Sequence, residues 1–400
     1  MKELPHVKVM RRFQAWDELP VLPEGRIGIY VGSHTHFSEK QNRAIDRFCA
    51  TYDAVVICDH TSGYYGKYKL LPTLVQLQSD ITSPFPPLDL MVHIGEISAA
   101  SFNDTIPAKE VWRVSEDGEL RDPFKKLTTV FQMSEEMFFL HYGKDGCNRH
   151  VLIDECRELF GEIYEQIPEL PFCNIWTAMQ LSSRLPKGAL FHMGVSNTRR
   201  CWNMFQLPES VESACNVGCC GIDGCVSTLV GASLVNPDRL CYVVVGDLTF
   251  FYDLNSLGNH HIGTNLRVML VNNGRGTEFR LGIHHCNVFG DDADKYMAAA
   301  GHFGNKSPLL VKHYAEDLGF HYLSATTKEE FMTALSNFTN PQLSDHSMIL
   351  EVFTDSKDES EALYLMSHIQ SDAKGMVRSK LKDAVRNVAG EKGINAIKKF

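Results

Sequence analysis

Two neighbouring apolar runs of this sequence each stop at a short side chain that carries oxygen. Residues 242–245 end at the Gly-Asp step of Asp247, and residues 268–271 end at the pair Asn272-Asn273. If both runs are parallel strands, their carboxyl ends meet at the edge of the sheet where α/β proteins bind ligands. Carboxylate and amide oxygens suit Mg²⁺, which leaves its other positions to phosphate and water. The spacing therefore predicts a magnesium and phosphate site, and the helix expected after Asp247 would offer free N–H groups to the phosphate.

Each half of this pattern also has a simpler explanation. Asp247 could do no more than cap the helix that follows it. The two asparagines could do no more than form a turn. Because about one helix's length of chain separates the two halves, as in a βαβ unit, the pattern as a whole favours the metal site.

The elements that must position these side chains alternate between short apolar runs and amphipathic stretches, as in α/β proteins. The runs are apolar on both faces, which is typical of parallel strands covered by helices on both sides. The predicted fold class is therefore α/β, with two Rossmann-like, doubly wound parallel sheets. The expected strands are residues 26–32, 54–59, 88–95 and 110–114 in the first sheet, and 189–196, 213–217, 241–247, 267–273 and 347–355 in the second. The expected helices are residues 38–50, 222–234, 253–263, 308–318 and 327–338, with a helical connector at about 148–183.

This order of elements divides the chain into five segments. The predicted boundaries are a linker over 1–19, a central Rossmann-like domain over 20–145, a helical connector over 146–186, a second domain over 187–370 and a C-terminal helical tail over 371–400. The tail holds eight Lys/Arg against three Asp/Glu, and its apolar residues recur at helical spacing, which predicts a basic amphipathic helix.

The composition excludes several classes of protein. The formal charge of −10 argues against a nucleic-acid-binding protein, which normally presents a basic face. No run of about 18 apolar residues is present, so no membrane span is expected. The first residues lack the apolar stretch of a signal peptide, and together with the twelve cysteines this predicts reduced thiols and a cytoplasmic location. No G-x-G-x-x-G fingerprint follows the first expected strand, which disfavours a nucleotide-dependent oxidoreductase or transferase.

Four cysteines lie close together in the second expected domain. They are Cys215, Cys219, Cys220 and Cys225. Their spacing matches neither a zinc knuckle nor a ferredoxin cluster. We therefore expect small residues packed closely beside another group, and no metal ligands.

The segment that contains the Gly-Asp step resembles a known family. The run GDLTFFYDLNSL (246–257), with the two asparagines that come after it, is similar to the metal and diphosphate motif of thiamine diphosphate (ThDP) enzymes, in which Gly-Asp-Gly is more usual. Leu248 in place of the second glycine resembles the 2-succinyl-5-enolpyruvyl-6-hydroxy-3-cyclohexene-1-carboxylate (SEPHCHC) synthases of the menaquinone pathway. The segments GIDGCVSTLVGAS (221–233) and GVSNTRR (194–200) are similar to further motifs of that family. In the first expected domain the likeness is only architectural.

The resemblance implies a role for each matching residue. Asp247 and Asn273 would bind Mg²⁺ through their side chains, and Arg275 through its carbonyl oxygen. Ile222 would lie under the cofactor and hold it bent, so that its amino group reaches the thiazolium ring. Ordinary core packing is the alternative for Ile222. The other residues implied in binding ThDP are Ser196, Asn197, Gly246, Leu248, Thr249, Gly276 and Thr277 at the diphosphate, and Cys219, Cys220 and Gly221 at the pyrimidine edge.

The substrate side departs from the family. Of the cations expected there only Arg200 remains, because Val217 stands where the family has an arginine and residues 101–102 where it has a Lys-Arg pair. Glu278 replaces an apolar contact, and Arg280 lies nearby in the sequence. Each lost charge-assisted contact would cost about 1.5–3 kcal/mol. A small 2-oxo acid is therefore expected in place of the family's polyanionic substrate.

Two pairs of histidines are candidates for proton transfer. His284 and His285 follow the cofactor motif, where a proton shuttle to the substrate would be useful. His260 and His261 fall inside the helix expected over 253–263 and are assigned to packing or to the surface.

The resemblance implies a ThDP- and Mg²⁺-dependent decarboxylase or carboligase, that is, a lyase or transferase, acting on a 2-oxo acid. Family members carry a pyrimidine-binding domain before the central domain, and this domain supplies a glutamate that activates the cofactor. Because this sequence begins at the linker before the central domain, we expect that a separately encoded pyrimidine-binding domain is its partner and that the chain forms a homo-oligomer. A non-catalytic ThDP-binding or scaffold protein is the alternative.

Overall fold

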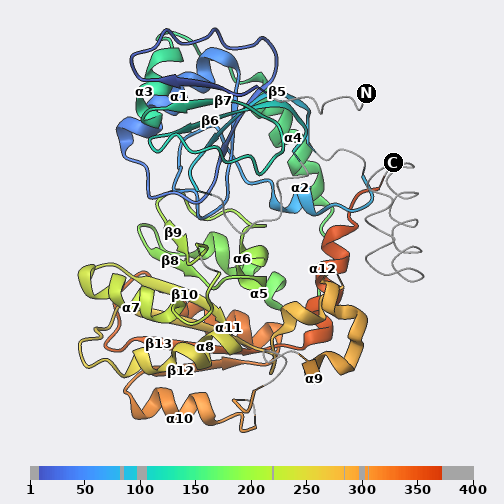
Figure 1. Ribbon diagram of the computed structural model, residues 1–400. Coiled ribbons are helices and arrows are strands. Elements are labelled where there is room, and N and C mark those ends of the chain that lie inside the picture. Colours follow the sequence, from blue (N-terminus) through green and yellow to red (C-terminus); the bar gives the residue numbers. More distant parts are fainter. Residues whose placement is uncertain are drawn as a thin grey trace.

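The computed structural model describes residues 9–81, 85–96, 106–218, 220–282, 284–296, 302–304 and 306–371. Within these ranges the chain forms two sheets, one in the upper and one in the lower half of Figure 1. Every pairing between neighbouring strands of these sheets is parallel. Helices lie between and around the sheets (Figure 1), so the predicted α/β, doubly wound fold class is confirmed.

The first sheet has seven strands in the order β1-β7-β6-β5-β2-β3-β4. Its strands are β1 (Arg11–Gln14), β2 (Ile27–Val31), β3 (Val55–Ile57), β4 (Lys69–Leu70), β5 (Leu88–Ile94), β6 (Ala108–Ser115) and β7 (Leu127–Gln132). The four predicted strands correspond to β2, β3, β5 and β6. β1 lies within the segment expected to be a linker and pairs with β7 at the edge of the sheet. Its RRFQ sequence has no apolar run because an edge strand is only partly covered.

Four helices accompany the first sheet, namely α1 (Glu39–Tyr52), α2 (Thr73–Leu77), α3 (Glu135–Tyr142) and α4 (Val151–Glu165). α1 begins after Ser38, which accepts a hydrogen bond from Gln41 N while the Gln41 side chain accepts one from Ser38 N. This capping box explains where the helix starts. Ile45 and Phe48, three residues apart, are fully buried and carry α1 onto the core.

The strand order of the first sheet reverses between β2 and β5. In open α/β sheets this is the point outside which a ligand crevice forms. A Cβ atom at Gly32, just after β2, would lie 1.9 Å from the carbonyl oxygen of Glu96, just after β5, so only glycine allows this approach. The carboxyl ends of the two strands are thereby held together on the side that faces the second domain (Figure 1).

The second sheet has six strands in the order β12-β13-β11-β10-β8-β9. Its strands are β8 (Leu190–Met193), β9 (Glu212–Cys215), β10 (Cys241–Gly246), β11 (Leu266–Asn272), β12 (His321–Ala325) and β13 (Met348–Phe353). The five predicted strands are all present. β12 was not predicted from the sequence. It lies at the edge of the sheet and is partly exposed, so its HYLSA sequence contains no apolar run. β10 and β11 are neighbours near the centre and are almost wholly buried.

The helices of the second half are α5 (Asn174–Leu181), α6 (Asn197–Trp202), α7 (Cys225–Val235), α8 (Asp247–Asp253), α9 (Ala293–Tyr296), α10 (Leu310–Asp317), α11 (Lys328–Phe338) and α12 (Ser356–Ser367). The helix predicted over 253–263 is wrong in position, because α8 begins directly after β10 and a 3₁₀ helix continues it over Leu254–Gly258. The phenylalanines of α8 continue the apolar run of β10, so the sequence pattern did not indicate where the helix begins. His260 and His261 consequently lie in an exposed turn outside any helix.

The connector between the sheets consists of two helices, α4 and α5, where one helical stretch was expected. Pro168 and Pro171 lie between them and prevent a continuous helix. Trp202 of α6 donates its indole N–H to Asn174 Oδ1 of α5 at 3.3 Å, and its ring lies 4.9 Å from that of Phe191 in β8. α5 thus anchors α6, which carries the end of the GVSNTRR segment.

Buried hydrogen bonds join the two halves of the molecule. The His60 ring donates from Nε2 to Phe205 O at 2.8 Å, and the His60 backbone N–H donates to Asn203 Oδ1 at 2.9 Å. Gln78 Nε2 donates to Met366 O at 2.8 Å. Because these groups are withdrawn from water, separating the halves would leave several of them without partners.

The basic tail predicted over 371–400 lies outside the described residues, apart from its first residue. The last helix described is α12, which runs beside the connector (Figure 1). No helix in the described part of the chain is long and apolar enough to cross a bilayer.

Loss of stability in acid is an expected consequence of the buried His60. Burial lowers the pKa of His60 to about 3, helped by the charge of Lys69. The unfolded chain therefore binds a proton that the folded chain does not, and stability is lost as the pH falls from about 6.5 towards 3. His60→Gln should reduce this loss of unfolding free energy by about 1.4 kcal/mol per pH unit between about pH 6 and pH 4.

Urea denaturation at several pH values measures this difference. The control is His261→Gln, because His261 is exposed. It should leave the pH dependence of the parent unchanged. A His60→Gln variant with the same pH dependence as the parent would contradict the prediction.

Candidate functional site

Asp247 is buried at the start of α8, with 2% of its surface exposed. Its Oδ1 accepts a hydrogen bond from Leu248 N at 2.7 Å. Its Oδ2 accepts bonds from Asn273 N at 3.1 Å and Gly274 N at 2.5 Å. The carboxylate therefore holds the turn after β11 against the end of β10. A residue that only capped its own helix would not make the two bonds to that turn.

Oxygen atoms of the same turn are buried and lack partners in the part of the chain that the structure describes. Asn273 Oδ1 and Thr277 Oγ1 have no hydrogen-bond partner among the described residues. A buried polar atom without a partner is costly and marks a place where an ion or ligand can complete the site. A carboxylate, an amide oxygen and a hydroxyl are suitable ligands for Mg²⁺ and neighbours for its phosphates. The residues present therefore fit the predicted metal and diphosphate.

The other residues predicted at the diphosphate lie along the same strand ends. Thr249 is buried on α8. Gly276 precedes the 3₁₀ helix Thr277–Arg280, and the Arg275 carbonyl accepts a bond from Thr277 N at 2.9 Å. The chain thus collects the following predicted residues at the ends of β10 and β11: Gly246, Asp247, Leu248, Thr249, Asn273, Arg275, Gly276 and Thr277.

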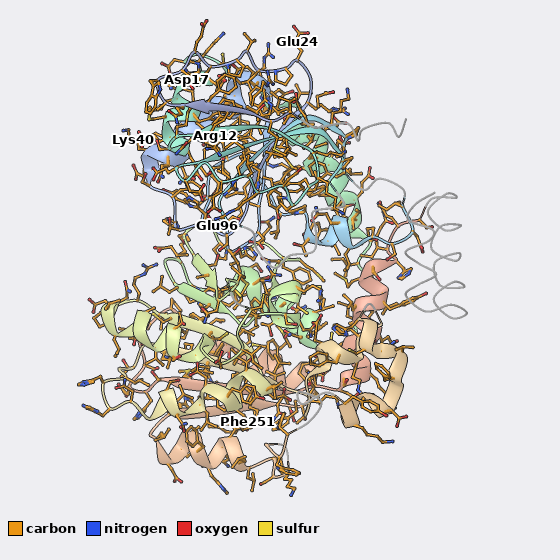
Figure 2. The ribbon with its side chains drawn as sticks, in the orientation of Figure 1. Arg12, Asp17, Glu24, Lys40, Glu96 and Phe251 are labelled. Atoms are coloured by element: carbon orange, nitrogen blue, oxygen red, sulfur yellow. The ribbon has the colours of Figure 1, made fainter. Side chains whose placement is uncertain are left out.

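His302 is a residue of this site that the sequence did not reveal. Its Nε2 lies 3.0 Å from Asp247 Oδ2, and its Nδ1 accepts a hydrogen bond from Gly304 N at 2.9 Å. Because Nδ1 accepts this bond, the ring hydrogen lies on Nε2, the nitrogen that is close to the Asp247 carboxylate. The ring also lies 4.9 Å from that of Phe251, labelled in Figure 2. Because His302 is remote from Asp247 in the chain, only the tertiary structure shows this contact.

Arg200 and Glu278 form a bidentate ion pair. Arg200 Nη1 donates to Glu278 Oε2 at 3.0 Å, and Nη2 donates to Oε1 at 2.6 Å. Burial alone would raise the pKa of Glu278, but the hydrogen bonds and charge of Arg200 hold that pKa below its ordinary value. Two residues that were predicted separately on the substrate side are therefore bound to each other.

Ser196 and Asn197, predicted at the diphosphate, lie directly before and at the start of α6. Ser196 has a φ of 66°, which is uncommon for a residue with a side chain. Asn197 Oδ1 accepts hydrogen bonds from Arg200 Nη1 at 3.4 Å and from Cys201 Sγ at 3.7 Å. The Ser196 side chain lies close enough to Glu278 to lower the pKa of that carboxyl as well. The segment therefore contacts the ion pair at both of its ends.

The pyrimidine-edge segment follows β9. Ile222 is half-buried and belongs to neither hydrophobic cluster of the described residues. An ordinary core residue would belong to one of them. The place of Ile222 beneath the cofactor stays a prediction. Cys220 is exposed with a φ of 52°, and its thiol lies 3.6 Å from Val217 O. Cys219 and residues 101–102 lie outside the described residues. The cysteines that are described are free, and no metal-binding group of His, Cys, Asp or Glu occurs in the described chain.

The remaining predicted residues lie beyond the cofactor turn. His284 lies close enough to Glu278 for its charge to lower the pKa of that carboxyl. The side chain of His285 is outside those described. Arg280 donates a hydrogen bond to Gly290 O in the following loop. The role of both histidines in proton transfer stays a prediction.

A cavity of about 970 Å³ lies between the two domains. Glu96, labelled in Figure 2, and Glu135 at the start of α3 line it from the first domain. Val217 and Gly218 line it from the second domain. The His34 ring contributes Nε2, 3.3 Å from Glu135 Oε2. The cavity adjoins the segment predicted at the pyrimidine edge.

Comparison with known proteins bears on the predicted resemblance. No family model matches the sequence. The chain is similar to curated 2-succinyl-5-enolpyruvyl-6-hydroxy-3-cyclohexene-1-carboxylate synthases of Bacteroides fragilis (33% identical over 263 residues, 64% of this chain and 45% of the relative), Phocaeicola vulgatus (32% over 265 residues, 64% and 44%) and Bacteroides thetaiotaomicron (32% over 259 residues, 64% and 44%). The chain thus spans less than half the length of these relatives. The resemblance predicted from the motifs is confirmed.

Proposed function

We propose that this relative of the SEPHCHC synthases binds ThDP and Mg²⁺ at the carboxyl ends of β10 and β11 and takes part in the decarboxylation or ligation of a 2-oxo acid. One observation carries the proposal. The buried Asp247 carboxylate holds the turn after β11, and Asn273 Oδ1 and Thr277 Oγ1 of that turn lack partners among the described residues. The similarity to the synthases supports the identity of the cofactor.

ThDP, when bound, supplies an electron sink for the loss of CO₂ from a 2-oxo acid. The chain's own residues would hold it in place. Asp247, Asn273 and the Arg275 carbonyl would hold the metal, and the Thr277 hydroxyl would contact the diphosphate. Ile222 would support the bent form of the cofactor, and the cavity between the domains would admit the substrate.

We propose further that a pyrimidine-binding domain of another chain completes the site and supplies the activating glutamate. Large apolar side chains are exposed in the loop region beyond the cofactor turn, namely Val288, Phe289, Tyr296 and Phe303. The rings of Phe289 and Tyr296 lie 5.7 Å apart, and exposed apolar side chains that lie together mark surfaces for protein association. They support docking of another domain and the formation of a homo-oligomer.

A non-catalytic ThDP-binding or scaffold protein is the second candidate. One observation favours it, since two charged groups of the site are already engaged by the chain itself. Glu278 binds Arg200, and His302 Nε2 lies 3.0 Å from Asp247 Oδ2. An enzyme of this kind would have to release His302 from Asp247 when the metal binds.

ThDP with Mg²⁺ should raise the melting temperature of the purified protein, and Asn273→Ala should remove most of this rise. Asn273 Oδ1 has no partner among the described residues, so its removal deletes a metal ligand without breaking an internal hydrogen bond to that atom. A ligand that binds the folded chain alone stabilises it by mass action. Differential scanning fluorimetry with and without ThDP and Mg²⁺ measures the effect.

The matched control is Asn255→Ala, at an exposed position of the 3₁₀ helix after α8. This variant should keep the full response of the parent. If ThDP failed to raise the melting temperature of the parent even with a pyrimidine-binding domain present, the cofactor assignment would be wrong.

A further inference from the structure

We propose that Glu278 is a built-in counter-carboxylate for Arg200 and that it restricts the site to 2-oxo acids with a single carboxylate, an inference that rests on the proposed function. Both terminal nitrogens of the Arg200 guanidinium donate to the two oxygens of Glu278, at 3.0 and 2.6 Å. This is the two-bond arrangement in which arginine binds the carboxylate of a ligand. Glu278 therefore takes the place that a second carboxylate of a substrate would take.

The surrounding residues hold both partners of the pair. Arg200 lies on α6, where Asn197 Oδ1 accepts a further bond from its Nη1 at 3.4 Å. The Ser196 side chain lies close enough to the Glu278 carboxylate to lower its pKa. Glu278 follows the turn that the Asp247 carboxylate holds against β10. The pair is thus fixed by residues that are themselves predicted to contact the cofactor.

Both members of the pair stay charged, although each side chain is only 21% exposed. Burial opposes each charge, but Arg200 holds the pKa of Glu278 below its ordinary value and Glu278 raises the pKa of Arg200. The pair is consequently neutral as a unit. If a second carboxylate of a substrate displaced Glu278 from Arg200, the Glu278 carboxylate would remain partly buried without its partner. Its negative charge would then lie beside the negative charge of the substrate. A monocarboxylate requires no such displacement.

Tethering makes this restriction stronger. Glu278 and Arg200 are 78 residues apart, and the fold delivers the carboxylate to the guanidinium. A tethered group acts at an effective concentration that is at least in the millimolar range. A free dicarboxylate at ordinary concentration would therefore compete poorly for Arg200. The neighbouring Ser196 and Asn197 are neutral and cannot replace the guanidinium as a partner for that second carboxylate.

The test replaces Glu278 by Gln and, separately, by Leu in the full chain. Isothermal titration calorimetry then measures the binding of 2-oxoglutarate and of pyruvate, so no turnover is required. The affinity for 2-oxoglutarate should rise about tenfold or more in both variants, because one charge-assisted contact becomes available. The affinity for pyruvate should change less than about twofold. The double variant R200Q/E278Q should lose the gain, since the guanidinium is absent.

Three results would overturn the inference: equal binding of 2-oxoglutarate by the parent and the single variants, a gain that persists in R200Q/E278Q, or no binding by either single variant. Melting temperatures with and without ThDP and Mg²⁺ are recorded on the same proteins. A ThDP response without the dicarboxylate gain would contradict only this inference. A dicarboxylate gain without any ThDP response would contradict the proposed function and retain the role of Glu278 at Arg200.

Discussion

Asp247→Ala is expected to lower the free energy of unfolding by about 2–4 kcal/mol and to abolish the response to ThDP and Mg²⁺. The Asp247 carboxylate accepts three backbone N–H bonds, and two of them come from the turn after β11. Alanine would leave these donors without an acceptor, and the turn would no longer be held at the end of β10. Urea denaturation measures the loss of stability, and scanning fluorimetry measures the response to the cofactor.

Asp247→Asn separates the structural role from the predicted metal role. Asparagine keeps one acceptor oxygen for the turn, so most of the stability should remain. Its neutral amide binds Mg²⁺ more weakly than a carboxylate does, so the ThDP response should still be lost. An alanine variant as stable as the parent would show that the carboxylate does not hold the turn. An asparagine variant that responds like the parent would contradict the metal assignment.

Release of CO₂ from pyruvate is expected only when a pyrimidine-binding domain with its glutamate is supplied to the chain. The activating glutamate acts as a proton donor, and proton transfer of this kind contributes about 10²–10⁴-fold to a rate. Glu278 does not replace it in the site, because Arg200 engages both of its oxygens. The measurement compares the chain alone, the chain with a co-expressed pyrimidine-binding domain, and the chain with a Glu→Gln form of that domain.

The three samples distinguish the two candidate functions. Activity only with the intact domain, and without formation of SEPHCHC, would agree with the proposed enzyme and its small substrate. Full turnover by the chain alone would refute the need for a partner domain. Formation of SEPHCHC would contradict the proposed change of substrate. Silence in all three samples, with ThDP still bound, would support the scaffold protein.

The central strands could be predicted from the sequence, whereas several others could not. β10 and β11 are buried on both faces, so the sequence of each strand is an apolar run that ends at a polar residue. β1 and β12 lie at the edges of their sheets, and their stability comes from backbone pairing with β7 and β13. Backbone pairing depends little on side-chain type, so the composition of these strands carried no strong signal.

The side chains at the ends of β10 and β11 could also be predicted from the sequence, because each belongs to a short motif of adjacent residues. The type and order of Asp247 and Asn273 predicted that oxygen-bearing side chains would meet at one sheet edge, since parallel strands place their carboxyl ends together. The motif around them also determined the resemblance that the comparisons confirmed. The positions of these residues along the chain were sufficient to predict both the common sheet edge and the resemblance.

Only the tertiary structure decided which charges meet. Arg200 lies on α6 and Glu278 on the 3₁₀ helix after β11, and no periodicity or spacing links them. His302 reaches Asp247 from a segment beyond α9, for the same reason. A charge pair depends on distances of a few ångströms in space, and a linear sequence does not record such distances between remote segments. The sequence by itself therefore predicted the kind of site, and folding decided that Arg200, the cation predicted on the substrate side, is already paired with a carboxylate of the same chain.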